Sequence, residues 1–350
     1  MLFRCQNCGV EFNIDPKKVP NPNVRFRCIR CKVGYLAHVA SGKEPQTTTS
    51  ATPAAGPKGA ATGLPSTPQQ ARQMLVQIKD LPSLPFVATK VIELTSSPNA
   101  TMKQMERVIL QDSALASKVL RYSNSALYGR AGQISSLTDA LVLLGFSTVK
   151  TIVIASSVKS MHATSSSKYN FAGKTMWAHS VEVAIAARLT ARRSDKSLVE
   201  EAFVVGLLHD IGKMVIESRL PGMVTRIMRM SKESDESLEE LEDKVLGINH
   251  SQLGATLCKK WNFPDVLEKA IMYHHNPSKN KKSAKLSHFA CLADAISYHM
   301  ALPAPNRSEN VSEILEMESS KALNINEPAL AELINETRET VETSRKVFDM

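Results

Sequence analysis

The stretch GLLHDIGK, residues 206–213, ends an apolar run and places a histidine directly beside an aspartate. His209 and Asp210 are residue types that bind metal ions in proteins, but two side chains cannot complete a metal site. Neighbouring positions on a helix point about 100° apart, so the two side chains are expected to diverge. Such a pair suits a site in which the imidazole binds one ion and the carboxylate bridges to a second. The remaining ligands must come from elsewhere in the chain.

Four further histidines and one aspartate supply candidates for those ligands. They lie in MWAHSVEVAIAARL, in LGINHSQLGATLCKKW, at the end of the predicted helix PDVLEKAIMYHH and in CLADAISYH, and they are His179, His250, His274, His275 and Asp294. A single histidine of this kind is more often a hydrogen-bonded core residue than a ligand. As an ordered set they predict a metal centre. Imidazole and carboxylate ligands suit Fe, Mn or Zn, and paired ions suit phosphoester hydrolysis.

The sequence around these residues predicts an all-α domain over residues 71–300, with residues 301–350 as a helical tail of the same domain. Apolar residues recur at helical spacing, no convincing alternating strand is present, and ten or more helices are expected, one pair being broken at Gly145. The most apolar stretch, ALVLLGFSTVKTIVIASSV, is too polar to span a membrane. No export signal precedes the domain, so a cytoplasmic protein is expected.

The N-terminal region predicts a separate small unit. Two Cys-x-x-Cys pairs, Cys5 with Cys8 and Cys28 with Cys31, have the spacing of a tetrahedral zinc site. We therefore expect a zinc ribbon over residues 1–38, with two disulfides or four unrelated thiols as the alternative. Residues 39–70 are rich in Thr, Ala, Pro and Gly, which predicts a flexible linker.

The positive charge of the chain is concentrated in this region. Residues 1–60 carry nine Lys or Arg against three Asp or Glu, a balance of +6 out of the formal net charge of +9. Seven of these cations could contact phosphates: Arg4, Lys17, Lys18, Arg25, Arg27, Arg30 and Lys32. A nucleic-acid-binding ribbon is one hypothesis, and a ribbon that docks on protein or is purely structural is the favoured one.

The helical region resembles the HDOD (HD-related output) domain of the HD superfamily over about residues 74–300. The resemblance rests on LPSLPFVATKVIEL, ILQDSALASKVLRYSNSALYG, ISSLTDALVLLGFSTVKTIV, GLLHDIGKMVI, HSQLGATLCKKWNFPDVLEKAIMYHH and LADAIS. The segment of residues 1–38 is similar to the zinc ribbons found at the N-termini of many bacterial proteins.

The resemblance implies a bacterial signal-transduction protein related to the HD-GYP phosphodiesterases, which cleave cyclic di-GMP with two or three metals. By motif, the seven candidate ligands fall on that family's metal positions, and Lys213 falls on its phosphate-contacting lysine. Two departures weaken the implied hydrolysis. The loop NPSKNKKSAK replaces the Gly-Tyr-Pro signature, and Thr175 stands where trinuclear members carry a glutamate.

Two functions follow from this pattern. The favoured one is a regulatory protein that acts through partner contacts of its HDOD domain, with a site capable of binding metal. The alternative is a metal-dependent phosphohydrolase acting on a nucleotide or cyclic dinucleotide, in which Asp210 bridges two ions and Lys213 neutralises developing charge. Lys279, Lys281, Lys282 and Lys285 either contact phosphates beside the site or form a solvated loop. Cys258 and Cys291 are expected to be buried structural thiols.

Overall fold

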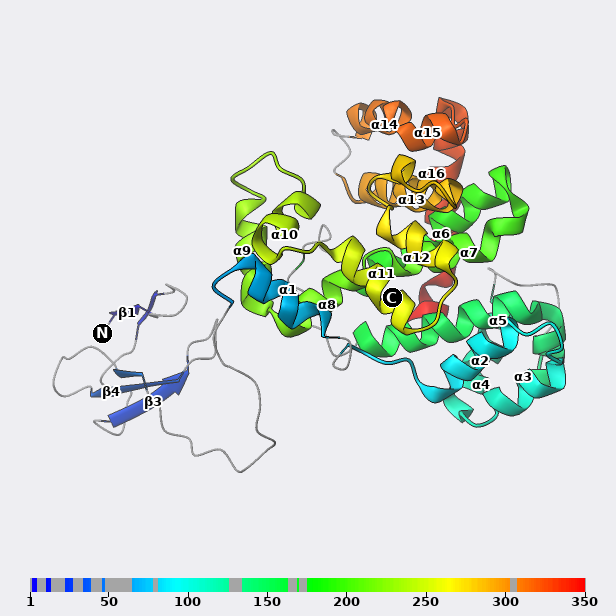
Figure 1. The fold of residues 1–350 in the computed structure, drawn as a ribbon, viewed down its shortest axis with the longest axis horizontal. Coiled ribbons are helices and arrows are strands. Elements are labelled where there is room, and N and C mark those ends of the chain that lie inside the picture. Colours follow the sequence, from blue (N-terminus) through cyan, green and yellow to red (C-terminus); the bar gives the residue numbers. More distant parts are fainter. Residues whose placement is uncertain are drawn as a thin grey trace. The chain divides into compact units, whose positions relative to one another are not determined.

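The computed structural model describes residues 2–4, 11–13, 23–27, 34–38, 46–47, 65–77, 81–125, 134–162, 169, 175–302 and 307–349. The chain divides into two compact units, Met1–Thr62 and Gly63–Met350. Their elements are labelled in Figure 1.

The described strands of the first unit form two separate antiparallel sheets. Strand β1 (Leu2–Arg4) pairs with β2 (Glu11–Asn13), while β4 (Gly34–His38) lies between β3 (Asn23–Arg27) and β5 (Gln46–Thr47). Strand β5 falls inside the segment expected to be a linker. The four cysteines predicted to bind zinc lie outside the described residues, so the metal prediction for them is not tested.

The described part of the second unit is helical, as predicted from the sequence. Its α-helices are α1 (Pro68–Val76), α2 (Phe86–Thr95), α3 (Met102–Ile109), α4 (Ser113–Ser123), α5 (Leu137–His162), α6 (Met176–Ser194), α7 (Val199–Leu208), α8 (Ile211–Arg219), α9 (Pro221–Met230), α10 (Leu238–Leu246), α11 (His250–Lys260), α12 (Asp265–Met272), α13 (Ala284–Ala301), α14 (Arg307–Glu316), α15 (Glu318–Ala322) and α16 (Glu327–Phe348). Two short 3-10 helices are η3 (Lys196–Leu198) and η4 (Pro277–Lys279). The first helix begins three residues before the expected domain start at residue 71.

Helix α6 is the centre of the fold and is packed on by α7, α13 and α16. Nearly its whole surface is buried, which is the behaviour of a core helix rather than of an amphipathic one. Helix α7 approaches α6 closely at Gly206, where a Cβ atom would lie 2.8 Å from the Cα of Ala184. This close packing brings the C-terminal end of α7, where His209 follows, beside α6, which carries His179.

Helix α5 is broken at Gly145, as predicted, because this residue has φ 71° and ψ 171° in the midst of helical neighbours. Among the described residues it is the one helix long and apolar enough to cross a membrane. However, 61% of its most apolar window is buried inside the protein. Burial of this kind is what the core helix of a water-soluble domain shows.

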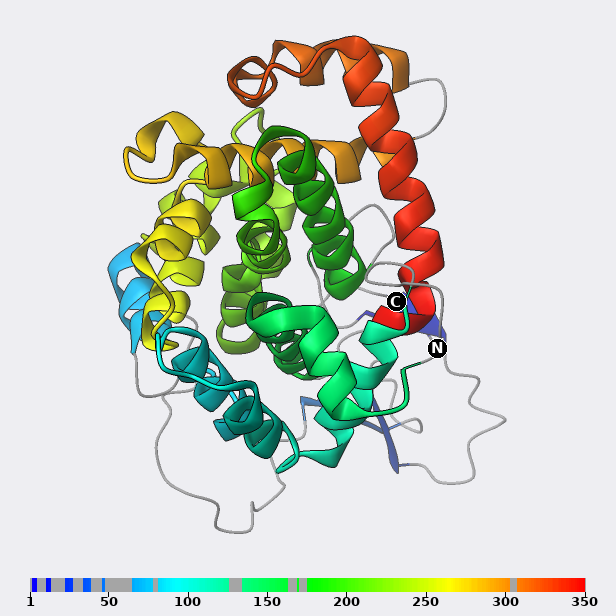
Figure 2. The same ribbon diagram turned by 90° about the vertical axis from the view of Figure 1, so that its right-hand side faces the viewer.

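The C-terminal helix α16 joins opposite ends of the second unit. Figure 2 shows it running beside α6 from the α14–α15 end towards α4 and α5. At its end Phe348 is 1% exposed, and its ring lies 5.0 Å from that of Tyr122 and 6.0 Å from that of Phe203. The indole Nε1 of Trp177 donates to the Phe348 carbonyl at 2.9 Å. Residues 307–349 therefore pack as part of the same helical unit.

Helices α8 and α11 make the closest backbone approach near the predicted site. A Cβ atom at Gly212 would lie 2.0 Å from the carbonyl oxygen of His250 and 2.9 Å from the backbone nitrogen of Gly254. The glycine thus allows α11 to place His250 against the residue that precedes α8, which is Asp210. Backbone cannot yield as a flexible side chain can, so any larger residue must separate the two helices.

We predict that Gly212→Ala lowers the free energy of unfolding by about 3 kcal/mol, because the added methyl group overpacks a backbone contact. Thermal and urea unfolding followed by circular dichroism measure this change. Gly222→Ala on the exposed surface of α9 is the matched control and is expected to be neutral or slightly stabilising. Equal stability of the two variants would contradict the close approach of α8 and α11.

Candidate metal centre

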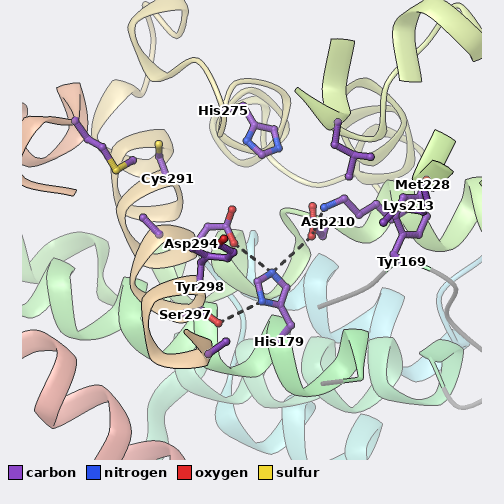
Figure 3. Close-up of a pocket in the computed structure, with 14 residues that line it drawn as sticks. Tyr169, His179, Asp210, Lys213, Met228, His275, Cys291, Asp294, Ser297 and Tyr298 are labelled. Carbon is purple, nitrogen blue, oxygen red and sulfur yellow. Dashed lines mark hydrogen bonds and ion pairs between the residues drawn. The ribbon is translucent and has the colours of Figure 1, made fainter. Parts of the chain in front are cut away.

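All seven residues predicted as ligands gather at one place (Figure 3 shows four of them, with Lys213). His179 lies on α6 and Asp294 on α13, while His250 is the first residue of α11. His209 and Asp210 lie at the junction of α7 and α8. The predicted helix carrying His274 and His275 is shorter than expected: α12 ends at Met272, and the two histidines lie in the turn that follows.

The expectation that His209 and Asp210 diverge was wrong. It assumed one continuous helix, but α7 ends at Leu208 and α8 begins at Ile211, and Asp210, which lies between them, has φ −100° and ψ 6°. This change of chain direction turns both side chains towards the same point, with His209 Nε2 3.3 Å from Asp210 Oδ2.

The carboxylate of Asp210 lies at the centre of the cluster and faces histidines with both oxygens. Its Oδ2 lies 3.6 Å from Nε2 of His179 and 3.3 Å from Nε2 of His209. Its Oδ1 lies 3.3 Å from Nε2 of His250 and 3.9 Å from Nε2 of His274. Two overlapping ligand groups result, each with its ligand atoms within 4.8 Å of one another. Asp210 belongs to both groups, which is the position that a bridging carboxylate occupies.

Backbone carbonyls fix the orientation of two of the imidazoles. Nδ1 of His209 donates to the carbonyl of Gly206 at 2.7 Å, and Nδ1 of His274 donates to the carbonyl of Ile271 at 2.6 Å. A carbonyl can only accept, so each Nδ1 must carry the hydrogen and each Nε2 can offer a lone pair. This arrangement of the outer nitrogen is typical of metal-binding histidines.

Polar side chains fix the orientation of the other two imidazoles, those of His179 and His250. Nδ1 of His179 lies 3.2 Å from the hydroxyl of Ser297, which itself donates to Glu182 at 2.9 Å and can therefore accept from the imidazole. Nδ1 of His250 donates to Oε2 of Glu242 at 2.6 Å. All four histidines thus direct Nε2 towards Asp210.

Among the residues that the structure describes, three of the atoms that converge on this point are buried and have no hydrogen-bond partner: His209 Nε2, Asp210 Oδ1 and His274 Nε2. A buried polar atom left without a partner costs about 1–3 kcal/mol, so this cluster is expensive as a purely structural feature. Divalent cations between these atoms would satisfy all three. The donor set of imidazoles and carboxylates fits Fe, Mn or Zn.

The charges of the cluster are arranged around Asp210. Burial opposes its ionisation, but His209 and Lys213 outweigh burial and hold the pKa of this carboxyl well below its ordinary value. The ammonium of Lys213, 2.7 Å from Oδ2, stays charged because Asp210 outweighs burial and raises its pKa. Burial and the neighbouring imidazoles lower the pKa of His274, which keeps that ring neutral and able to bind a cation.

Asp294 completes the group on the His179 side. Its Oδ1 lies 3.3 Å from Nε2 of His179 and 3.9 Å from Nε2 of His209. Burial opposes its ionisation, yet the contacts with His179 and His209 outweigh burial and lower its pKa. His275 completes the other group: its Nε2 lies 3.0 Å from Nε2 of His250, and its side chain reaches the surface.

A cavity of about 450 Å³ opens onto the cluster beside Asp294 and Lys213 (Figure 3). Its walls are largely apolar and include Met228, Leu238, Tyr298 and Met317. The site therefore has room for a ligand that places a polar group on the cluster and an apolar group against these walls.

Other residues singled out in the sequence have different surroundings. Lys282 pairs with Asp265 at 2.7 Å and Lys285 with Asp195 at 3.0 Å, so these two lysines form surface ion pairs. Lys279 lines a second cavity, of about 580 Å³, which shares Lys213 and His275 with the first.

The structure also shows the surroundings of Thr175, Cys258 and Cys291, which the sequence analysis singled out. Thr175 is the N-cap of α6, and its hydroxyl accepts from the backbone of Ala178. A helix cap therefore stands at the position where the resemblance to the trinuclear HD-GYP enzymes would place a glutamate. Cys258 is buried, as expected, and burial raises the pKa of its thiol. Cys291 is only partly buried and lines the cavity; burial raises its pKa to about 11, so it is a protonated thiol near neutral pH.

Sequence reasoning missed the residues that hold the outer nitrogens: Glu182, Glu242 and Ser297. Glu242 contacts Nδ1 of His250, and Ser297 contacts Nδ1 of His179. Glu182 accepts a hydrogen bond from Ser297. The eight-residue spacing between Glu242 and His250 is the one sequence signal for this contact. Because the interval includes the end of α10, helical periodicity does not predict that the two side chains meet.

The comparisons with known proteins agree with this fold. The profile of the HDOD domain family matches residues 81–277, which include every candidate ligand except Asp294. An uncharacterised protein from Treponema pallidum (strain Nichols) is 23% identical over 202 residues, which are 57% of this chain and 38% of that relative. The match thus spans well under half of the relative's length.

Several crystal structures share the helical fold. A protein from Shewanella amazonensis SB2B, provisionally named a phosphohydrolase, is 26% identical with a TM-score of 0.64 over 79% of this chain and 97% of that one. An HDOD domain protein of unknown function from Geobacter sulfurreducens is 23% identical with a TM-score of 0.66, covering 81% and 99% of the two chains. A protein from Marinobacter aquaeolei VT8, provisionally named a signal transduction protein, is 20% identical with a TM-score of 0.61, covering 94% and 77%.

The family profile covers more than half of the sequence and includes six of the seven converging residues. This chain belongs to the HDOD domain family.

Proposed function

We propose that this chain is a regulatory protein of signal transduction whose HDOD domain binds two divalent cations through the bridging carboxylate of Asp210. The observation that carries the proposal is the set of buried, unpartnered atoms on His209, Asp210 and His274. Hydrogen bonds to the opposite nitrogen orient each imidazole as a metal ligand requires.

The two positions would be bounded by the two groups of side chains. Asp210, His179, His209 and Asp294 would hold one cation, and Asp210, His250, His274 and His275 would hold the other. Burial keeps water from competing for most of these ligands, and Lys213 offsets part of the negative charge when the positions are incompletely filled.

A second candidate function is phosphoester hydrolysis at the same centre, which the cavity beside Asp294 favours. Bound divalent cations would supply Lewis acidity towards a phosphoryl oxygen. Lys213 lines the cavity and would attract the anionic phosphoryl group, while Met228, Leu238 and Tyr298 would receive an apolar or aromatic substituent. The relative from Shewanella amazonensis named provisionally as a phosphohydrolase supports this candidate through its 26% identity.

The signalling role also requires a protein partner, which we propose docks on the α2–α5 region. Three of the large hydrophobic side chains exposed among the described residues belong to this region: Phe86 (65%), Leu110 (60%) and Val142 (68%). These exposed apolar side chains are the observation that supports a contact surface in this region. We further propose that the protein acts in the cytoplasm.

For the first unit we propose a zinc ribbon held by Cys5, Cys8, Cys28 and Cys31. Each Cys-x-x-Cys pair falls in the sequence between two paired strands, the first between β1 and β2 and the second between β3 and β4. This order supports a ribbon in which two turns face one ion.

The metal proposal predicts that residues 63–350, purified and reconstituted, bind two equivalents of Fe, Mn or Zn by elemental analysis. Asp210→Asn should lose both equivalents, because this residue belongs to both ligand groups. Asp265→Asn changes an exposed aspartate on α12 and should retain both. Circular dichroism shows whether each variant is folded. Two equivalents in the folded Asp210→Asn variant would contradict the bridging role.

The hydrolase candidate predicts that the metal-loaded chain cleaves bis(p-nitrophenyl) phosphate. Lys213→Met should slow cleavage about 100-fold, because it removes a cation that would stabilise the developing charge. Lys282→Met, which changes an exposed lysine paired with Asp265, should leave the rate unchanged. No cleavage by the wild-type chain with both cations bound would rule out this candidate and leave the regulatory function.

The ribbon proposal predicts that the full chain contains one more zinc equivalent than residues 63–350, and that Cys28→Ser loses it. The ribbon would be refuted if that variant kept its full zinc content, or if the four cysteines showed no free thiol under denaturing conditions.

The nucleic-acid hypothesis predicts binding that weakens steeply with salt and disappears when residues 1–40 are removed.

A further inference from the structure

The second cavity, of about 580 Å³, adjoins the candidate centre on the side away from Asp294. It lies between the first turns of α10 and α11 and the turn that follows α12. Lys213, Leu238 and His275 line both cavities, so the two cavities meet at the edge of the centre. A ligand held beside these three side chains can therefore extend into both cavities.

The walls of the two cavities differ in chemistry. The first cavity is lined by apolar and aromatic side chains such as Met228, Tyr298 and Met317. In the second, among the described lining residues that it does not share, only Met272 has no hydroxyl, amide or charged group. A ligand that fills both cavities therefore needs one apolar substituent and one polar substituent.

Polar groups in the second cavity are available to a ligand. The side-chain amide of Gln252 and the hydroxyl of Tyr273 both line it, and neither forms a hydrogen bond with another described residue. Beside them, Nδ2 of Asn249 donates to Oδ2 of Asp243 at 2.9 Å, which holds that carboxylate in the wall. An amide and a phenol each donate and accept, and a carboxylate accepts. This mixture of groups suits hydroxyls, which also donate and accept.

The charge of the second cavity opposes a further anion. Three carboxylates line it, those of Glu239, Glu240 and Asp243, and outside the shared residues one described ammonium, that of Lys279, stands against them. No ion pair joins any of the three carboxylates to another described residue. Burial raises the pKa of Glu239, and the charge of Asp243 acts in the same direction. A neutral substituent with hydroxyls fits this cavity better than a second phosphate does.

We propose that the centre binds a phosphodiester with a single phosphate and two unlike substituents. The apolar or aromatic substituent lies in the first cavity, and a substituent rich in hydroxyls, such as glycerol or a sugar, lies in the second. The phosphate lies where the cavities meet, beside Lys213 and the proposed cations. The inference rests on the two-cation function proposed above, and it holds whether the diester is cleaved or only bound.

The test is isothermal titration calorimetry of the full, metal-loaded chain with two phosphonate monoesters, glyceryl phenylphosphonate and methyl phenylphosphonate. Both carry one negative charge and a phenyl group that cannot leave as an alcohol, and they differ only in the second substituent. The glyceryl ester should bind about 10-fold more tightly, because only it forms hydrogen bonds in the second cavity. A glyceryl ester with a further phosphate on its glycerol should bind more weakly than the glyceryl ester itself.

Two variants assign this preference to the second cavity. Gln252→Ala and Tyr273→Phe should each bring the ratio of the two affinities closer to one, since each removes polar groups that line the cavity. Gln111→Ala changes an exposed glutamine after α3, which lines neither cavity, and should keep the wild-type ratio. Circular dichroism shows whether each variant is folded.

Three results would overturn the inference. They are no binding of either ester, equal affinities of the two esters for the wild-type chain, and a glyceryl preference that is unchanged in both folded variants. Cation binding by residues 63–350 and cleavage of bis(p-nitrophenyl) phosphate are measured separately, so the proposed function can stand when this inference fails. If elemental analysis finds no cation, the proposed function fails, and this inference fails with it.

Discussion

The buried carboxylate of Asp210 is the constraint on which the rest of the site depends. A charge at 1% exposure has to be compensated, and Lys213 supplies one positive partner at 2.7 Å. The remaining space around the carboxylate is taken by Nε2 atoms, two of which have no hydrogen-bond partner in the described part of the chain. The Asp210 carboxylate outweighs burial and raises the pKa of His209, so the contact between the two side chains is attractive when His209 carries a proton, and a cation between them would take the place of that proton. The architecture of the second unit serves to hold this arrangement together.

Close contacts between helix backbones bring the converging side chains together. Gly206 lets α7 lie against α6, and Gly212 lets α11 lie against α8, so three histidines from three directions reach one aspartate. The turn between α7 and α8 lets His209 and Asp210 face the same point. Outer contacts to Ser297 and Glu242 then fix which nitrogen each imidazole presents.

Much of this could be predicted from the sequence. Helical periodicity and the break at Gly145 indicated the fold class, and the His and Asp motifs indicated the side chains that the structure brings together, because both signals lie in short stretches of sequence. The convergence of His209 with Asp210 was not predicted, since it depends on a helix boundary that periodicity does not mark. Glu242 was missed for a different reason: its role exists only through a contact between α10 and α11.

The most direct test of this account is anomalous X-ray diffraction from crystals of the chain grown with Mn²⁺ or Zn²⁺. The account predicts two anomalous peaks beside Asp210, one near each carboxylate oxygen. The absence of any peak between Asp210 and the four imidazoles, with metal present in excess, would contradict it.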